Sequence, residues 1–266
     1  MNKKIGFIGC GNMAGAMIGG IIKSGLMKKD EIIASAVHEE TTKRAAKEFG
    51  IDTTTDNVQV AKNARVVVLA VKPVYYFQVI DEIKDVVNEE QIIISIAPGI
   101  TIKSMEERFG KSVKMVRTMP NTPALVGEGI TAMCINDNMT EEETQYAKSI
   151  LESFGKAEII KENLMDVVVS VSGSSPAYVF MFIEAMADAA VADGMPRKQA
   201  YTFAAQSVLG SAKMVLETGK HPGELKDMVC SPGGTTIEAV RVLEEKGMRS
   251  SVIEAMKACT KKASGK

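Results

Sequence analysis

The fold is decided by the stretch Lys4-Ile-Gly-Phe-Ile-Gly-Cys-Gly-Asn-Met-Ala14. Its first five residues predict a short buried strand, and a helical run follows the glycines as far as Ser24. A G-x-G-x-x-A pattern between a strand and a helix is typical of a dinucleotide-binding loop. Gly9 allows the tight turn, Gly11 lets backbone approach a pyrophosphate, and Ala14 replaces the third glycine where the helix packs on the sheet.

Strands and helices alternate through the rest of the first half. Strands are predicted at residues 31–37, 66–71, 92–96, 113–117, 130–135 and 158–160. The unbroken apolar runs among them are typical of a central parallel sheet. Ligands lie at the carboxyl ends of such strands, so we expect Lys72-Pro73, Ala97-Pro98 and Met119 to Thr122 to border one crevice. The sequence predicts an α/β fold that begins with a Rossmann-type dinucleotide-binding domain over residues 1–161.

Helical patterns replace the strands after that point, at residues 164–171, 176–193 and 197–218. Residues 177–192 are apolar nearly all round, interrupted by Glu184 and Asp188, so this helix must be buried on several sides. A domain of about a hundred residues has difficulty burying such a helix alone. We therefore predict an all-α dimerisation domain over residues 162–266 that forms a homodimer through its helices. The Lys-rich end from Lys261 is expected to be disordered.

Composition excludes several classes of function. With 32 basic and 33 acidic residues, nothing points to nucleic acid or to an anionic membrane surface. No apolar run approaches the length of a membrane span, and the N-terminal region reaches glycine too early for a signal peptide. The four cysteines are scattered and there are two histidines, so no disulfide framework, metal site or Ser-His-Asp hydrolase is expected. The sequence favours a soluble cytoplasmic protein.

The second strand carries the signal for cofactor choice. NAD-specific sites place an acid at the end of this strand to hold the adenosine ribose. This chain has Ser35-Ala-Val-His38 there, with Lys43-Arg44 nearby. We favour NADP, with Ser35 as a donor to the 2′-phosphate and the basic residues as nearby cations.

A second candidate site lies in the run Asp227-Met-Val-Cys-Ser-Pro-Gly-Gly-Thr-Thr-Ile-Glu-Ala-Val-Arg-Val-Leu243. Its proline and paired glycines cannot continue a helix, whereas Thr235 and Thr236 are N-cap candidates for the helix that follows. A turn that presents free backbone N–H groups at a helix N-terminus attracts a carboxylate or a phosphate. The alternative is a capped helix that binds nothing.

Segments along the whole chain resemble pyrroline-5-carboxylate reductase, the enzyme of the last step of proline biosynthesis. They are residues 8–14, 70–73, 119–123, 172–178, 221–222 and 227–243. The last segment is the most specific, and Ser175 departs from the glycine usual in the family. The resemblance implies hydride transfer from NADPH, or sometimes NADH, to the C=N carbon of 1-pyrroline-5-carboxylate, which gives L-proline.

The resemblance also assigns residues. The cofactor would contact Ile8, Gly9, Cys10, Gly11, Asn12, Met13, Ala14, Ser35, Asn57, Ala70, Val71, Lys72, Pro73, Ala97 and Pro98. The substrate would contact Asn121, Val229, Ser231, Gly233, Gly234, Thr235 and Thr236, with Ser231 and backbone N–H groups on its carboxylate. Thr236 is the implied catalytic residue, because it would hydrogen-bond the ring nitrogen. The family assembles as dimers or rings of dimers.

Two alternatives remain open at this point. A β-hydroxyacid dehydrogenase has the same two-domain plan and uses a lysine, for which Lys198 and Lys213 are available, but neither lies in a glycine-rich setting. That reading also leaves residues 231–236 unexplained. A non-catalytic NADP-binding sensor would bind cofactor without turnover. Cys230 is a candidate redox switch, although a small side chain packed beside a turn is the simpler interpretation.

Overall fold

A computed structural model describes residues 3–265 and divides them into two compact units. Unit 1 runs to Ser174 and includes the end of the chain from Thr260; unit 2 is Ser175–Cys259. The sequence-based boundary after residue 161 stays a prediction.

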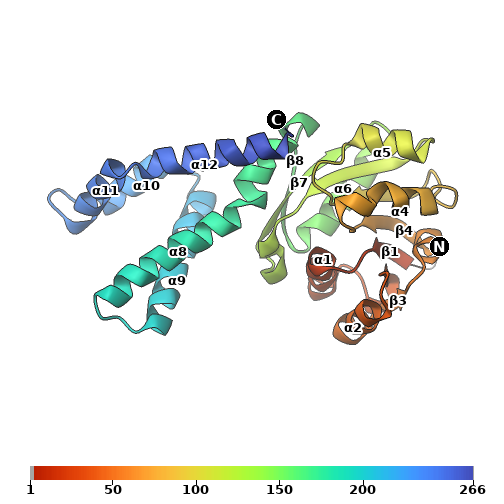
Figure 1. The fold of residues 1–266 in the computed structure, drawn as a ribbon, viewed down its shortest axis with the longest axis horizontal. Helices are drawn as coiled ribbons and strands as arrows, with labels where there is room; N and C mark the ends of the chain where they lie inside the picture. The colour runs from red at the N-terminus through yellow and green to blue at the C-terminus, as the bar shows by residue number, and fades with distance from the viewer. Residues whose placement is uncertain (1–2, 266) are drawn as a thin grey trace. The chain divides into compact units, whose positions relative to one another are not determined.

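Unit 1 is built on an eight-stranded sheet in the order β3-β2-β1-β4-β5-β6-β7-β8 (Figure 1). The strands are β1 Lys3–Ile8, β2 Ile32–Ser35, β3 Asp52–Thr54, β4 Ala64–Leu69, β5 Ile92–Ser95, β6 Lys114–Met119, β7 Gly129–Ile135 and β8 Gly155–Ile159. The first six are parallel, β7 runs antiparallel to β6, and β8 is parallel to β7. This confirms the predicted α/β fold class with its Rossmann-type first half.

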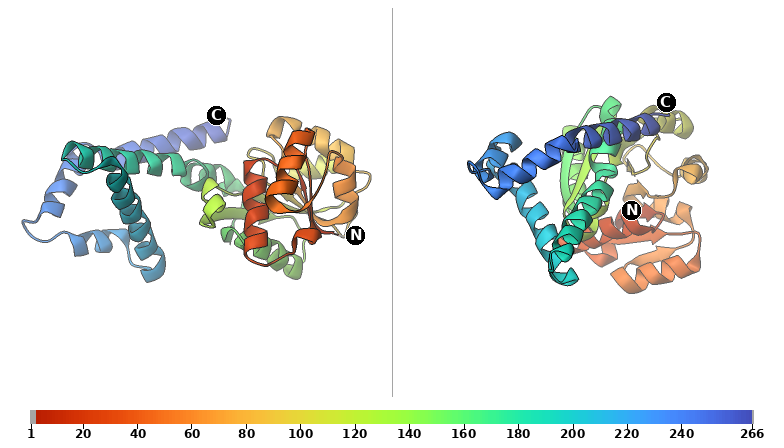
Figure 2. Two further views of the ribbon diagram at one scale, coloured as in Figure 1. Left: turned by 90° about the horizontal axis from the view of Figure 1, so that it is seen from below. Right: turned by 60° about the vertical axis from the view of Figure 1, so that its left-hand side comes forward.

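Helices cover both faces of this sheet (Figures 1 and 2). One face packs against α1 (Asn12–Lys23), α2 (Glu39–Phe49) and α6 (Glu141–Glu152). The other packs against α3 (Asn57–Asn63), α4 (Tyr76–Ile83), α5 (Ile102–Phe109) and α7 (Met165–Val168). Because β1 lies between β2 and β4, the chain reverses its direction of winding there, and ligands bind at such a switch point.

A buried tyrosine ties the carboxyl ends of the central strands together. Tyr76 is fully buried, and its hydroxyl lies 3.1 Å from the carbonyl of Leu69 at the end of β4 and 2.7 Å from Ser95 Oγ at the end of β5. The carbonyl of Ser95 accepts a hydrogen bond from Thr118 in β6. Burial raises the pKa of the Tyr76 hydroxyl, so it stays neutral. These hydrogen bonds therefore hold together the carboxyl ends of β4, β5 and β6, which border the predicted crevice.

Glu162 anchors the chain where it leaves the last strand, β8, and enters the helices that follow. Its Oε1 accepts hydrogen bonds from the backbone N–H of Ile102 and from Arg117 Nη1, both at 2.8 Å. The first contact places a carboxylate at the N-terminus of α5, where the helix dipole favours negative charge. Glu162 begins the short helix η4 (Glu162–Leu164), and α7 and a π-helical segment, η5 (Val169–Gly173), follow it.

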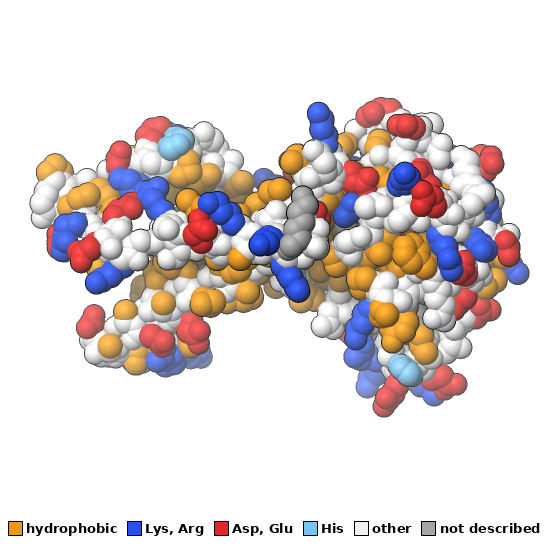
Figure 3. Space-filling view, turned by 45° about the horizontal axis from the view of Figure 1, so that its top comes forward, with side chains coloured by type: hydrophobic (Ala, Val, Ile, Leu, Met, Phe, Trp, Pro, Cys, Tyr) orange, Lys and Arg blue, Asp and Glu red, His pale blue; other side chains and the backbone are white. Residues whose placement is uncertain are grey.

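Unit 2 consists of helices α8 (Ser175–Ala192), α9 (Arg197–Thr218), α10 (Pro222–Val229) and α11 (Thr235–Glu245), with most of α12 (Met248–Ala263). Within α8, all of which the structure describes, Ala187 is the only buried residue. Exposed apolar side chains therefore gather along these helices (Figure 3). They include Val179, Phe180, Met181, Phe182, Tyr201, Phe203, Leu209 and Leu216.

One continuous helical stretch, Glu162–Ala192, is long and apolar enough to cross a membrane by length and composition alone, with a mean hydropathy of 1.4 in its most apolar window. Such a stretch is weak evidence for a membrane, because a soluble helix covered by a partner subunit has the same composition.

Two sequence-based expectations need correction. Disorder was expected from Lys261, but α12 continues to Ala263, and Thr260 within it donates a 2.8 Å hydrogen bond to Ser170. Lys266 lies outside the described residues. β3, α3 and α4 were also not predicted from the sequence. β3 is three residues long and partly exposed, and α3 is seven residues long, so neither has a strong periodic pattern.

Candidate active site

The dinucleotide loop is shaped by a close approach of two backbones at Gly9. Its N–H donates to the carbonyl of Ser35 at 3.0 Å, and the N–H of Ala70 donates to the carbonyl of Ile8 at 2.8 Å. A Cβ at Gly9 would lie 2.5 Å from the Ala70 carbonyl oxygen, and φ is +98° there. Only glycine fits such a position. This contact brings the ends of β1, β2 and β4 together.

The start of α1 is open to a ligand. Gly11 is the N-cap of this helix, and no side chain caps it. A Cβ built on Gly11 would meet no atom within 4 Å. Uncapped N–H groups at a helix N-terminus, with free space beside the backbone, fit the pyrophosphate of a dinucleotide. The residues of this loop therefore suit NAD(P)H.

Ser35 is placed differently from its predicted role as a donor to the cofactor. The side chain is fully buried at the end of β2, and its hydroxyl donates to Asn57 Oδ1 at 2.7 Å. Asn57, the first residue of α3, donates in turn from Nδ2 to Glu82 Oε2 in α4 at 2.7 Å. The half-buried Asn57 thus covers Ser35. Sequence reasoning missed Glu82, which lies 25 residues from its partner.

The remaining predicted cofactor residues follow β4 and β5 at the same edge. Lys72 is exposed and is the N-cap of the short helix η2 (Pro73–Tyr75), with Pro73 in its first turn. Ala97 is buried directly after β5, and Pro98 beside it is exposed. The Tyr76 network lies beneath both loops. Two of the segments predicted to border the crevice are therefore brought to one edge of the sheet, together with the Gly9 loop.

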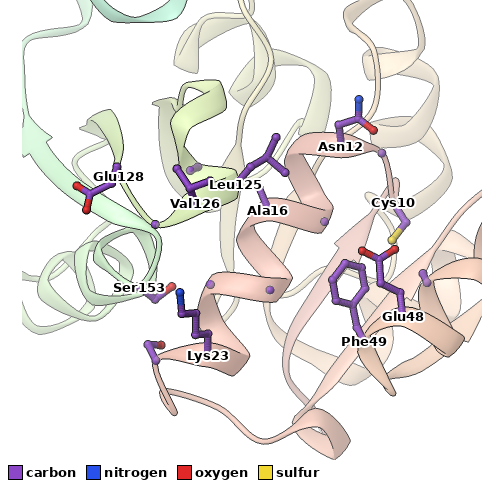
Figure 4. A pocket seen from close by; sticks show the side chains of 18 of the residues that line it. Cys10, Asn12, Ala16, Lys23, Glu48, Phe49, Leu125, Val126, Glu128 and Ser153 are labelled. Atoms are coloured by element: carbon purple, nitrogen blue, oxygen red, sulfur yellow. The ribbon is translucent and has the colours of Figure 1, made fainter. Parts of the chain in front are cut away.

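A cavity of about 850 Å³ starts at Cys10, Gly11 and Asn12 and continues along α1 (Figure 4). Glu48 and Phe49 of α2 line it on one side of α1, and Leu125, Val126 and Glu128 line it on the other. Only its beginning coincides with the predicted cofactor residues; Ser35, Asn57, Ala70–Pro73, Ala97 and Pro98 do not line it. The cavity therefore does not mark the whole site.

The groups around this cavity set its electrostatics. Burial raises the pKa of the Cys10 thiol, Arg44 opposes that shift, and Glu48 reinforces it. A neutral thiol in the loop is compatible with a bound phosphate and is a poor nucleophile. Of the basic residues predicted near the 2′-phosphate, Lys43 forms an ion pair with Glu39 at 2.8 Å. Arg44 lines the cavity and has no ion pair among the described residues.

The second candidate site is the turn between α10 and α11. The N–H of Gly234 donates to the carbonyl of Ser231 at 3.0 Å, and Gly233 has φ of +68°. A side chain at Gly234 would collide with the Ser231 hydroxyl. Thr235 and Thr236 were expected as N-cap candidates, but Gly234 is the N-cap and α11 begins at Thr235. The reason is that the closed turn leaves Gly234 in the extended conformation that an N-cap requires.

The arrangement of this turn suits an anion. No side chain caps α11, so the first backbone N–H groups of the helix are uncapped beside the Ser231 hydroxyl. Ser231 is exposed and Thr236 is half-buried, while Val229 ends α10 with an exposed side chain. His221 accepts a hydrogen bond from the N–H of Gly223 and caps α10, which is a structural role.

The side chain of Asn121, the predicted substrate contact in unit 1, already forms two hydrogen bonds within the protein. Its Oδ1 accepts from the N–H of Ile130 at 2.9 Å, and its Nδ2 donates to the carbonyl of Ser172 at 3.1 Å. The side chain is buried and connects the loop after β6 to β7 and to the π-helical segment. These contacts give it a positioning role, and a direct contact with substrate stays a prediction.

Comparison with known proteins identifies the family. A family model described as pyrroline-5-carboxylate reductase dimerisation matches residues 162–266. The pyrroline-5-carboxylate reductase of Escherichia coli (strain K12) is 54% identical over 99% of this chain and 98% of its own length. The chain belongs to the pyrroline-5-carboxylate reductase family. The helical half of this family member is accordingly a region of homo-oligomerisation.

Further relatives agree with this assignment. The pyrroline-5-carboxylate reductase of Arabidopsis thaliana is 40% identical over 98% of this chain and 94% of that protein. The structure of the Coxiella burnetii enzyme is similar with a TM-score of 0.92 and 36% identity, over 100% of this chain and 98% of that one. A Plasmodium falciparum pyrroline carboxylate reductase with NADP bound has a TM-score of 0.89 and 34% identity, over 98% and 97%.

The first half also has matches outside this family. A family model described as NADP oxidoreductase, coenzyme F420-dependent, matches residues 4–99. A Mycobacterium tuberculosis 3-hydroxyisobutyrate dehydrogenase has a TM-score of 0.52 and 14% identity, over 83% of this chain and 72% of that one, which is a likeness of fold alone. Lys213, a lysine that the dehydrogenase alternative could use, is exposed and lies 3.4 Å from Glu217. Nothing therefore favours that alternative over the reductase family.

The open space beside Gly11 leads to a prediction. Gly11→Ala is expected to keep the fold, with a stability loss of about 1 kcal/mol or less at the N-cap. The added methyl group would separate the backbone from the pyrophosphate, so the NADPH dissociation constant should rise roughly tenfold or more, as one lost close contact between charge and N–H implies. Titration of NADPH fluorescence measures the affinity, and thermal unfolding measures the stability. Unchanged affinity would remove Gly11 from the cofactor site.

Proposed function

We propose that the chain reduces 1-pyrroline-5-carboxylate to L-proline with NADPH, and with NADH as a second donor. The observation that carries this proposal is 54% identity over nearly the whole chain to a reductase of that name. An open dinucleotide loop at Gly9–Gly11 and an uncapped helix behind Ser231–Gly234 support it. NADPH is favoured because a related structure holds NADP and because no acid follows directly at the end of β2.

Unit 1 binds and orients the cofactor. The N–H groups at the start of α1 would hold the pyrophosphate, Asn57 would contact the adenosine ribose, and the segments Ala70–Pro73 and Ala97-Pro98 would contact the nicotinamide. When bound, the nicotinamide supplies a hydride. The Tyr76 network keeps these loops at a fixed separation, so little reorganisation is needed when the cofactor binds.

The loop of unit 2 binds the imine. The Ser231 hydroxyl and the N–H groups of Gly234, Thr235 and Thr236 hold the carboxylate, and the Thr236 hydroxyl holds the ring nitrogen. A cyclic imine is basic enough to be partly protonated in water, and its protonated form is already an electrophile. The C=N carbon gains the hydride, and the nitrogen keeps its proton as its positive charge disappears. Positioning and exclusion of water therefore carry much of the rate, and no histidine or carboxylate is required as a general acid.

The oligomer is a homodimer, or a ring of dimers, that forms through the helices of unit 2. The exposed side chains Phe180, Phe203 and Leu216 provide the apolar surface that such an interface buries. On this proposal the apolar stretch Glu162–Ala192 is covered by a partner subunit, not by lipid, and the protein is cytoplasmic.

The reaction is tested by following oxidation of NADPH and of NADH side by side, with 1-pyrroline-5-carboxylate as substrate. Turnover should be faster with NADPH, and L-proline should form in equal amount to the NADP⁺ produced. Absence of turnover with both cofactors would overturn the proposal. If NADPH still bound tightly in that case, the protein would be the non-catalytic sensor considered above.

The role of Thr236 is tested by substitution. Thr236→Ala should lower kcat/KM by roughly 10–1000-fold, the range for the loss of one well-placed hydrogen bond in the transition state. Thr236→Ser is the matched control, because it keeps the hydroxyl and should retain most of the activity. Near-normal kinetics in the alanine variant would remove Thr236 from the mechanism.

The assembly is tested by sedimentation of the whole chain in buffer without detergent. A dimer or an even multiple of it is the expected mass, since unit 2 leaves its apolar surface uncovered in a single chain. A monodisperse monomer would contradict the proposed interface. A chain that stays in solution only with detergent would instead favour a membrane for residues 162–192.

A further inference from the structure

An acid of α4 is linked to the end of β2 through a hydrogen-bonded asparagine. In a dinucleotide fold this strand end faces the adenosine ribose, and NAD-specific proteins place an acid there. This chain has Ser35 at that position, but Asn57 covers it at 2.7 Å, and Glu82 from α4 holds Asn57 at 2.7 Å. The chain of hydrogen bonds Ser35–Asn57–Glu82 thus connects β2, α3 and α4.

The direction of these bonds is set by Glu82. A carboxylate is only an acceptor, so Glu82 Oε2 must face the Asn57 NH₂ group, and Oδ1 is turned towards the Ser35 hydroxyl. The other oxygen of Glu82 accepts from Gln78 Nε2 at 3.1 Å, so both oxygens have partners. The NH₂ group has a second proton that Glu82 does not take, which is available to a ribose hydroxyl or to a phosphate.

The hydrogen-bond chain also brings negative charge close to Asn57. Asp56 caps α3, where its carboxylate accepts from the N–H groups of Val58 and Gln59, so acids flank Asn57 on two sides. Of the α2 cations predicted near the 2′-phosphate, Lys43 is paired with Glu39, whereas Arg44 has no ion pair among the described residues. A negative charge from Glu82 opposes a 2′-phosphate at the ribose and leaves a neutral 2′-hydroxyl almost unaffected.

We infer that Glu82 is a positioning and specificity-determining residue of the cofactor site. It orients the Asn57 amide for both cofactors, and its charge restrains the preference for NADPH over NADH. The chain therefore has an equivalent of the acid at the strand end, displaced to α4 and acting through an asparagine. This inference rests on the proposed NAD(P)H site.

The test compares two variants by the dissociation constants of NADPH and NADH, measured from cofactor fluorescence. Glu82→Gln removes the charge and keeps an acceptor for Asn57, so it should strengthen NADPH binding about threefold at low salt and leave NADH binding within about twofold. The gain should shrink at high ionic strength, because salt screens exposed charges. Glu82→Ala also removes the acceptor, and it should weaken NADH binding about fivefold, as one lost hydrogen bond to a charged group implies.

Glu89→Gln is the matched control. Glu89 is exposed and precedes β5, so it lies at the amino ends of the parallel strands, away from the proposed cofactor site. Removal of its charge should change neither the NADPH nor the NADH dissociation constant. An unchanged ratio of the two constants in Glu82→Gln would overturn the charge effect, and unchanged NADH binding in Glu82→Ala would overturn the positioning role. Failure of the proposed function is distinguishable, because it shows as absent turnover in the unsubstituted protein, whereas the dissociation constants of the Glu82 variants are measured without turnover.

Discussion

Unit 1 depends on the absence of a side chain at Gly9. Two strands that run in the same direction leave their carboxyl ends side by side, and here the backbone after β1 lies directly against the carbonyl of Ala70 after β4. The N–H of Gly9 also donates a hydrogen bond to the carbonyl of Ser35 at the end of β2. Any Cβ would separate the three strand ends, and with them the N-terminus of α1, the cover over Ser35 and the loop at Lys72. One backbone contact thus positions the parts of the proposed cofactor site that follow β1, β2 and β4.

Around that contact, the site is built from neutral groups that hold one another. Tyr76, Ser95 and Thr118 connect the ends of three strands, and Asn121 connects the loop after β6 to β7 and to the π-helical segment. Buried neutral hydrogen bonds of this kind fix loops without the desolvation penalty of a buried charge. This fits a reaction in which the electrophile arrives already protonated. The site needs fixed distances more than it needs a titrating group.

The sequence was sufficient where local signals decide the structure. The glycines of residues 9–11 predicted the loop, and a threonine three residues before a polar side chain is the local signal for the capping boxes that Thr101 and Thr140 form at α5 and α6. It was insufficient where packing between distant segments decides. The contact between Asn57 and Glu82 depends on the packing of α3 against α4, and nothing local to either residue indicates it. Asp56 was a missed signal, because an aspartate before a short helix is a common N-cap.

The apolar surface of unit 2 has a consequence for the life of a newly made chain. A single copy keeps large side chains of α8 and α9 in water, so part of its folding free energy is gained only when it meets another copy. The stability of the folded chain then depends on protein concentration, and dilution lowers the free energy of unfolding. A freshly synthesised subunit is a natural client for chaperones until it pairs, and a substitution on that surface would reduce the amount of protein in the cell before it altered catalysis.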